Sequence, residues 1–358
     1  MKLKTYLLFS LFVIIIACHR DRQEPLQIEA AEKSVNEGGG KVALRLLAEI
    51  ADEMRTAPES VRMRYELVLL RAYGAIGEPR DSLLPRLIDY YERAGTPNER
   101  MSLYFYRAVR AQDMNDYYEA EQNFEQAIQL IDTLREDCNR GFSCLVYFYA
   151  GNLCMLQKYY SEAIQKYKQS IAVLPSWYYT VSALNGCLAR AYYKNKEIDK
   201  AAAYYDLVYK DFTKGIQYSP QLTEELFEFY TQTKNWRRVK YMTPQMYDLI
   251  LYTTDSILVG NFYRNRAAYF EAKGLEDSVV YYLNKTVMYQ ESEDKVQTYY
   301  ALFRNKQKHR EYRSATEYAQ HYLSLNDSFL NKQKKTEIDR FNQEKLKMQQ
   351  KHLQIIRE

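Results

Sequence analysis

The stretch CLVYFYAGNLCMLQKYYSEAIQKYKQSIAVLP, residues 144–175, decides the fold of the chain. Apolar residues recur in it at helical spacing in two successive runs, and Pro175 ends the second run. Gly151 lies in the middle of the first run and Ala163 near the start of the second, so the two backbones can approach closely at these small residues. Large side chains such as Tyr167 fill the space around that contact. The pattern predicts two short antiparallel helices.

The same pattern recurs five more times along the chain. A small or β-branched residue near the start of each second helix marks the repeats, which are spaced 36 to 43 residues apart: Ala120, Ala163, Ala201, Val239, Val279 and Ala315. Twelve residues before each marker lies the position that should be small: Ala108, Gly151, Ala189, Phe227, Ala267 and Phe303. Because two of these positions hold Phe, the hairpins around Val239 and Ala315 are expected but their register stays open.

This recurrence resembles the tetratricopeptide repeat (TPR), a helical hairpin of roughly 34 residues. One such hairpin cannot bury its own apolar face, so successive hairpins stack on each other. The resemblance implies an all-α TPR superhelix over residues 41–325, with helices or turns longer than the family standard. The packing positions that it assigns are Ala120, Gly151, Ala163, Ala201 and Ala267.

The first residues have the features of an export signal. Lys2 and Lys4 precede an apolar run over residues 6–16, which is shorter than the ~20 residues that span a bilayer as a helix. Because Cys18 directly follows Ala17, residues 1–17 resemble a lipoprotein signal peptide, which implies that Cys18 is lipidated and anchors the chain to a membrane of the cell envelope. A plain secretory signal with an incidental Cys18 is the alternative.

Residues 18–40 contain Pro25 and three consecutive glycines at 38–40, with little apolar periodicity, and we expect a flexible tether there. The glycines are followed by Lys41 and Val42 rather than by the Lys-Ser or Lys-Thr of a phosphate-binding loop. Three amphipathic segments between residues 41 and 94 are expected to form degenerate hairpins that cap the array.

Composition limits the class of protein and its partners. The chain has 358 residues, of which 47% are hydrophobic, and only 8 Pro and 12 Gly, which favours a helical protein over an all-β one. A net charge of +4 does not indicate a nucleic-acid partner. The 36 tyrosines suit helix packing, and they also leave open a Tyr-rich binding surface.

No sequence motif indicates an enzyme, a cofactor or a metal site. The four His residues have no metal-ligand spacing, and the HExxH, GxSxG and GxGxxG motifs are absent. Glu224 and Glu225 are adjacent, so their side chains diverge on a helix, and no nucleophile accompanies them. Cys138 and Cys144 flank a five-residue loop, which leaves two alternatives open: a disulfide bridge or two separate thiols.

A protein-binding groove is the remaining candidate for a site. In stacked TPR hairpins the first helices line the concave face, and their inward positions predict the following groove residues: Phe105, Val109, Phe148, Asn152, Met155, Arg190, Tyr193, Arg264, Tyr300 and Arg304. The TPR clamps that hold a peptide carboxylate need further basic residues beside Asn152 and Arg190, and these are missing. We therefore expect a peptide or protein partner with an apolar segment. The alternative is that these side chains pack against the chain's own helices.

The last residues change in character. Residues 326–358 are rich in Lys, Glu and Gln, and this composition predicts a long charged helix with weak heptads. Two such helices could self-associate as a weak coiled coil. From residue 41 onward the chain resembles the extracytoplasmic TPR half of Gram-negative membrane regulators, in which a membrane span and a DNA-binding or histidine-kinase domain follow. The resemblance implies a non-catalytic, membrane-anchored scaffold or, as an alternative, a signalling component without its output domain.

Overall fold

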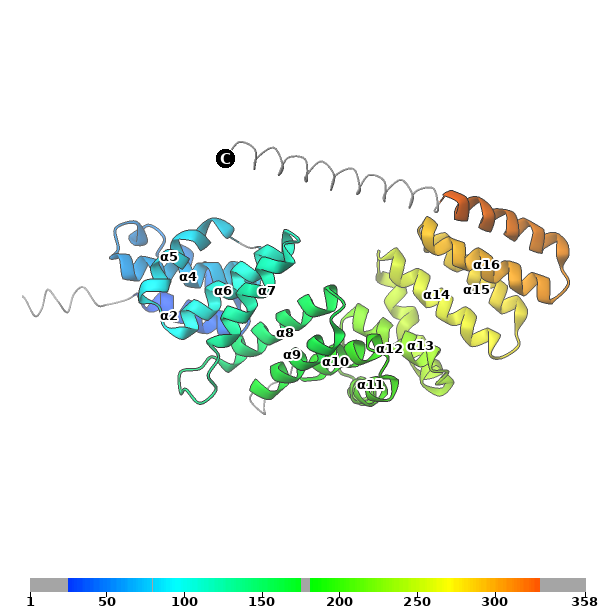
Figure 1. The fold of residues 1–358 in the computed structure, drawn as a ribbon, viewed down its shortest axis with the longest axis horizontal. Coiled ribbons are helices and arrows are strands. Elements are labelled where there is room, and N and C mark those ends of the chain that lie inside the picture. Colours follow the sequence, from blue (N-terminus) through cyan, green and yellow to red (C-terminus); the bar gives the residue numbers. More distant parts are fainter. Residues whose placement is uncertain (1–24, 79, 175–180, 329–358) are drawn as a thin grey trace, which may run out of the picture. The chain divides into compact units, whose positions relative to one another are not determined.

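The computed structural model describes residues 25–78, 80–174 and 181–328. Within these ranges the chain forms helices and turns and no strand, so the predicted all-α class is confirmed. The chain divides into two compact units, one up to Asp211 and one from Phe212 onward (Figure 1). Within the described ranges, no helix combines the length and the apolar character needed to cross a membrane. Residues 1–17, Cys18 and residues 329–358 lie outside the described part of the chain.

The first unit is a series of helical hairpins. Its elements are α2 (Leu26–Asn36), α3 (Gly40–Glu49), η1 (Glu53–Arg55), α4 (Glu59–Ala75), η2 (Asp81–Leu83), α5 (Leu84–Ala94), α6 (Pro97–Asp113), α7 (Tyr117–Gln129), α8 (Arg140–Leu156), α9 (Tyr160–Val173), α10 (Val181–Lys194) and α11 (Ile198–Thr213). The second unit continues with α12 (Pro220–Gln232), α13 (Trp236–Tyr252), α14 (Ser256–Glu271), α15 (Glu276–Tyr289), α16 (Ser292–Lys308) and a helix over 312–328.

Six hairpins share one turn, which sets their register. The residue five positions before each marker has a left-handed backbone, with φ between 58° and 68°: Asn115, Lys158, Lys196, Lys234, Gly274 and Arg310. In each turn the next backbone N–H donates to the carbonyl five residues earlier, as Tyr159 does to Cys154 at 2.8 Å, which satisfies the end of the first helix. Lys234 and Arg310 therefore place the hairpins around Val239 and Ala315 in the common register.

A seventh hairpin of this kind corrects the tether predicted over residues 18–40. Residues 26–36 form α2, and Gly38 is the left-handed turn residue, with φ of 83°. The next amide, that of Gly39, donates to the Ser34 carbonyl at 2.7 Å. Ala31 and Ala43 have no exposed surface. Ala43 follows the turn residue Gly38 by five positions, as each marker does in the later hairpins, and Ala31 lies twelve positions before Ala43. The array thus begins at α2 rather than at residue 41.

The marker positions lie in the cores of the two units. Ala120, Ala163, Ala201 and Val239 are fully buried, and Val279 and Ala315 are 4% exposed. Gly151 makes a close contact, because a Cβ atom there would lie 2.6 Å from Cε1 of the buried Tyr167 ring. The Tyr167 hydroxyl donates to Asn152 Oδ1 at 2.7 Å, which fixes the ring against α8. Helices α8 and α9 pack this closely only because residue 151 lacks a side chain.

We expect Gly151→Ala to lower the free energy of unfolding by about 1–3 kcal/mol, since the new methyl group overpacks against the Tyr167 ring. Gly260→Ala is the matched control within α14, because the nearest atom to its added Cβ is 3.5 Å away. The control should be neutral or stabilising by up to about 1 kcal/mol, as Ala favours helix over Gly. Urea denaturation of both variants checks this, and equal effects would contradict the assigned contact.

Candidate functional site: an apolar cavity in the first unit

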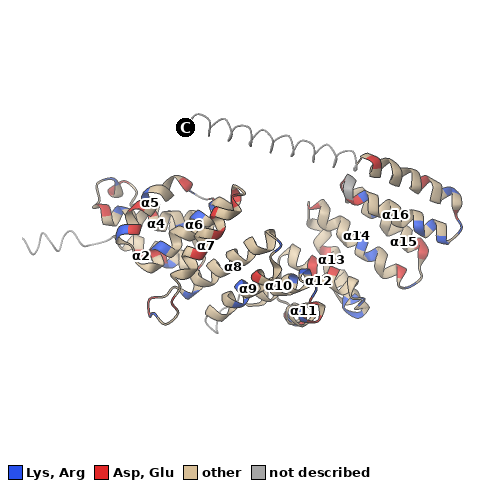
Figure 2. Ribbon diagram, in the orientation of Figure 1, with Lys and Arg blue, Asp and Glu red and all other residues tan. Residues whose placement is uncertain are grey.

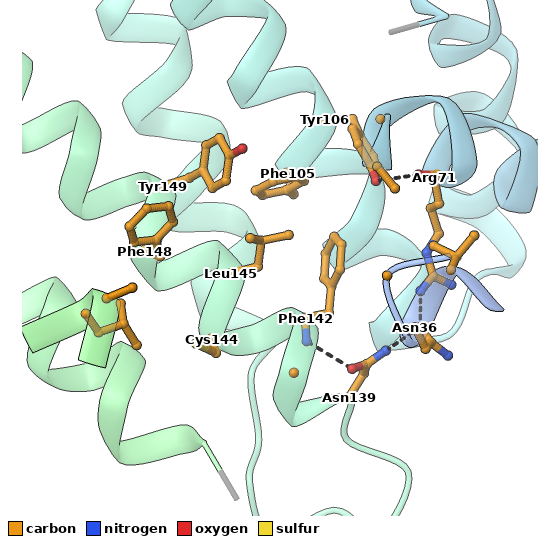
Figure 3. Close-up of a pocket in the computed structure, with 17 residues that line it drawn as sticks. Asn36, Arg71, Phe105, Tyr106, Asn139, Phe142, Cys144, Leu145, Phe148 and Tyr149 are labelled. Carbon is orange, nitrogen blue, oxygen red and sulfur yellow. Dashed lines mark hydrogen bonds between the residues drawn. The ribbon is translucent and has the colours of Figure 1, made fainter. Parts of the chain in front are cut away.

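A cavity of about 480 Å³ opens between the first helices of successive hairpins in the first unit (Figure 3). Helix α8 supplies most of its wall, and α2, α4, α6 and α10 supply the rest. The side chains that carry the argument are apolar or aromatic on one side, namely Phe105, Tyr106, Phe142, Leu145, Phe148 and Tyr149, and polar on the other, namely Asn36, Arg71 and Asn139. Because α8 faces four other helices, the hairpin stacking itself creates the cavity.

The aromatic wall is held rigidly. The Phe105 ring is 3% exposed and packs edge to face against Phe142 at 5.1 Å and Tyr149 at 5.2 Å between ring centroids. Phe148 packs in the same way against Tyr149 at 5.5 Å. Edge-to-face pairs of this kind each contribute about 0.5–1.5 kcal/mol beyond the area that they bury. The wall therefore keeps its shape without a ligand.

Hydrogen-bond donors gather at the polar end of the cavity. The Arg71 side chain is almost fully buried, and it donates from Nη1 to Glu32 Oε1 at 2.8 Å and from Nη2 to Asn36 Oδ1 at 2.5 Å. Asn139 Nδ2 also donates to Asn36 Oδ1, at 3.3 Å. The buried Arg71 Nε has no acceptor within the described residues. The Asn36 oxygen is thus occupied, while the Asn36 amide nitrogen donates no hydrogen bond within the same ranges.

Burial favours the neutral forms of two titratable groups of the cavity, the Tyr106 hydroxyl and the Cys144 thiol. Burial raises the pKa of the Tyr106 hydroxyl to about 12, and this hydroxyl donates to the Arg71 carbonyl at 3.4 Å. Burial also raises the pKa of the Cys144 thiol, whose Sγ lies 3.1 Å from Ser170 Oγ. A thiol must ionise to act as a nucleophile. Burial therefore disfavours the reactive thiolate form of Cys144.

The structure also decides between the two alternatives for Cys138 and Cys144. Both cysteines are free, because Cys144 turns toward Ser170 on α9 while Cys138 Sγ lies 3.8 Å from Ser143 Oγ. The disulfide alternative is therefore wrong for this structure. Within the described ranges, His, Cys, Asp and Glu form no group of three or more that could hold a metal ion.

Two of the predicted groove residues of the first unit, Phe105 and Phe148, line the cavity. The others lie elsewhere on the same helices. Val109 packs against the core cluster of α6, α7 and α8, and Asn152 accepts the hydrogen bond from Tyr167. Met155, Arg190 and Tyr193 are half-buried and do not line the cavity.

The predicted groove residues of the second unit do not converge on one point. Arg264 Nη2 lies 3.5 Å from Glu228 Oε1, at a separate polar cavity. Tyr300 is 42% exposed and packs against Tyr322, with ring centroids 5.4 Å apart. Arg304 is exposed and lines neither cavity. The groove across all hairpins stays a prediction, and the cavities that the structure shows lie within individual units.

Sequence reasoning missed most of the cavity. Phe142, Leu145 and Tyr149 continue the helical stripe of α8 at spacings of three and four residues, and extending that stripe toward the start of the helix would have found them. Asn36 and Arg71 carry no such signal. Asn36 reaches the cavity because α2 forms part of the first hairpin, in a segment where the sequence predicts a tether, and Arg71 on α4 donates to it.

Charged residues of both signs are interspersed along the helices of each unit (Figure 2). In the second unit one acid is unusual. Burial, followed by the neighbouring charges of Glu228 and Glu225, raises the pKa of the Glu224 carboxyl on α12 to about 7, while Arg264 and a hydrogen bond with Asn261 oppose this rise. The buried Glu224 Oε1 has no hydrogen-bond donor within the described residues. The fold therefore favours the protonated form of this acid.

Comparison with known proteins gives the fold and not a family. No protein-family model matches the sequence, and no curated protein matches it. Among solved structures, a signal-transduction ATPase with a TPR sensor from Pyrococcus horikoshii is 19% identical with a TM-score of 0.55, over 73% of this chain and 41% of that one. A chain of the APC/C hetero-tetramer is 12% identical with a TM-score of 0.51, over 80% and 50%.

A third structure, the C-terminal part of a TPR repeat-containing protein from Cytophaga hutchinsonii, is 14% identical with a TM-score of 0.48, over 74% of this chain and 95% of that one. This chain spans half or less of the Pyrococcus and APC/C chains. The likeness to the Pyrococcus and APC/C structures shows a TPR-like solenoid of helical hairpins, as the repeat spacing predicts.

The raised pKa of Glu224 predicts that the second unit loses stability as pH rises. Between the unfolded pKa of 4.5 and the folded pKa of about 7, the folded state holds a proton that the unfolded state has released. The free energy of unfolding should therefore fall by roughly 2–3 kcal/mol between pH 4.5 and 8. Glu224→Gln should remove this slope in urea denaturation, whereas Asp277→Asn, an exposed acid in α15, should leave it; a slope unchanged in Glu224→Gln would contradict the assignment.

Proposed function

We propose that the protein is a non-catalytic interaction module whose first-unit cavity receives apolar or aromatic side chains of a peptide or protein partner. The observation that carries this proposal is the rigid aromatic wall around an open volume of about 480 Å³. Transfer of one large apolar side chain from water into such a cavity contributes about 1.5–3 kcal/mol. Because the wall is already packed, little of that gain is lost in ordering the protein.

The polar end of the cavity orients the bound partner. The Asn36 amide nitrogen is available to donate to a main-chain carbonyl of an extended peptide, while Arg71 and Asn139 hold the Asn36 oxygen in place. A hydrogen bond of this kind adds about 0.5–1.5 kcal/mol. Its larger effect is on register, because it fixes which side chain of the peptide enters the aromatic part.

The alternative is a sensor component of a signalling system, related to regulators with TPR halves. Its specific support is the fold similarity to the Pyrococcus horikoshii ATPase, which is described as carrying a TPR sensor. The APC/C hetero-tetramer, in contrast, is an assembly, which corresponds to the scaffold role. Binding in the cavity is common to both roles. Only the sensor needs residues 329–358 to pass the binding event to a membrane partner or, by self-association, to a second copy.

The interaction role is tested by Leu145→Gln, which places an amide in the apolar wall of the cavity. Peptides selected by display on the wild-type protein should share an aromatic or aliphatic anchor residue, and Leu145→Gln should weaken their binding about tenfold, or ~1.4 kcal/mol, in calorimetric titration. The matched control is Leu134→Gln in the same unit, because Leu134 is 93% exposed outside the cavity. Equal affinities of the two variants, or selected peptides without an apolar anchor, would argue against this site.

We also propose that Cys18 is lipidated and holds the protein on a membrane of the cell envelope. The support is the short apolar run before Ala17-Cys18, since each buried CH₂ of an acyl chain contributes about 0.8 kcal/mol to membrane binding. Cys18→Ser should move the protein from the membrane fraction to the soluble fraction, and globomycin should leave the unmodified chain in its precursor form. Membrane association that persists in Cys18→Ser would reject the anchor.

A further inference from the structure

The second unit contains a cavity of different chemistry, which the proposed function does not use. It has a volume of about 680 Å³ and lies between the end of α12, the start of α13 and the second half of α14. Its walls are mainly polar, and the side chains that matter are Glu228, Gln232, Trp236, Arg264, Asn265 and Glu271. All of them belong to one unit, so the cavity depends on its hairpins alone.

Trp236 gives this cavity its one large aromatic surface. It is the first residue of α13, a position that holds Tyr, Ile or Glu in the other hairpins of the common register. Its ring packs edge to face against Tyr269, with centroids 5.8 Å apart and an interplanar angle of 78°. The half-buried indole is therefore held in one orientation at the edge of a polar space.

Asn265 gives the cavity a polar group that the protein itself does not satisfy. The residue is 4% exposed, and its Nδ2 has no hydrogen-bond acceptor within the described part of the chain. An unsatisfied buried donor costs about 1–3 kcal/mol. Because Asn265 is one of the residues that line the cavity, a bound ligand could supply the acceptor that the protein itself does not.

The charges of the cavity are balanced. Two acids, Glu228 and Glu271, face two bases, Lys234 and Arg264. Glu228 Oε1 accepts from Gln232 Nε2 at 2.8 Å and lies 3.5 Å from Arg264 Nη2. An anionic ligand would be matched by an excess of bases, and an apolar one by apolar walls. A balanced mixture of donors and acceptors instead matches hydroxyl groups, because each hydroxyl both donates and accepts.

We propose that this cavity binds a neutral saccharide. One sugar ring stacks on the Trp236 indole, and its hydroxyls exchange hydrogen bonds with the Asn265 amide and with the Glu228–Arg264 pair. The saccharide site is independent of the peptide cavity in the first unit, so either proposal can fail without the other. A polar peptide segment is the competing ligand class, and the experiment separates the two.

The test uses the two tryptophans of the chain, Trp177 and Trp236. In the full chain carrying Trp177→Phe, the emission of Trp236 is recorded during titration with maltohexaose, cellohexaose, chitohexaose and mannohexaose, and with a hexapeptide of Ser, Asn and Gly. We expect a saturable shift with at least one hexaose and none with the peptide. No shift with any hexaose up to 10 mM, or a shift with the peptide alone, would overturn the proposal.

Variants locate the binding by calorimetry with the hexaose that responds. Trp236→Ala and Asn265→Leu should each weaken it at least tenfold, whereas Trp236→Phe, which keeps an aromatic face, should stay within about threefold. Ala272 is exposed at the edge of the cavity, so the side chain introduced by Ala272→Arg should block entry without disturbing the core. This variant therefore tests the site even if Asn265→Leu alters folding. Leu145→Gln in the other unit should have no effect. Unchanged binding in Ala272→Arg and Trp236→Ala would reject the site.

Discussion

The contact between the Tyr167 ring and the bare backbone at Gly151 represents the constraint on which this fold depends. Two helices can pack at this distance only where the facing position lacks a large side chain, and Ala108, Ala189 and Ala267 meet the same condition in their hairpins. The left-handed turn residue five positions before each marker then fixes the register of the second helix on the first. In five of the six hairpins with a sequence marker this turn residue is not glycine, at a cost of roughly 1–2 kcal/mol each. The packed interior of each unit must offset that cost, so turn and core are stable only together.

Most of this architecture could be predicted from the sequence, because the constraint is periodic. Small residues at fixed spacing predict which helices pair and where they touch. For the hairpin around Val239, which has Phe227 at the position that is small elsewhere, the sequence predicts the pair of helices but leaves their register open. The first hairpin could not be predicted in the same way. Three consecutive glycines are compatible with a flexible tether or with a tight turn between two helices. The structure distinguishes the two, because Ala31 and Ala43 are buried in a core cluster that includes α4. Local sequence does not report that burial.

The cavity in the first unit shows a second limit. Helical periodicity predicts which faces of α6 and α8 are apolar, but not how deep each side chain lies. Phe105 and Phe148 line the cavity, whereas Val109 packs in the core of the first unit and Asn152 accepts the hydrogen bond of the Tyr167 hydroxyl. The polar end depends on Arg71 and Asn36, which come from two other helices. Arg71 and Asn36 come together because the first two hairpins stack on each other. A repeat pattern therefore predicts which helix faces are apolar, whereas the particular chemistry of the cavity comes from contacts between repeats.

Each unit contains a buried arginine, and the two buried charges are stabilised in different ways. Arg71 is paired with Glu32 and Asn36, and its charge is neutralised beside the apolar cavity. Arg266 in the second unit has no carboxylate partner within the described residues; it lies 4.7 Å from the Phe270 ring centroid and 5.0 Å from that of Tyr269. Tyr269 in turn supports Trp236 at the polar cavity. The abundant aromatic residues thus do more than fill the core, because the rings that stabilise a buried cation also fix the surface on which we place a sugar. One repeat geometry can in this way carry two binding chemistries, since the side chains at equivalent positions differ while the backbone that holds them is the same.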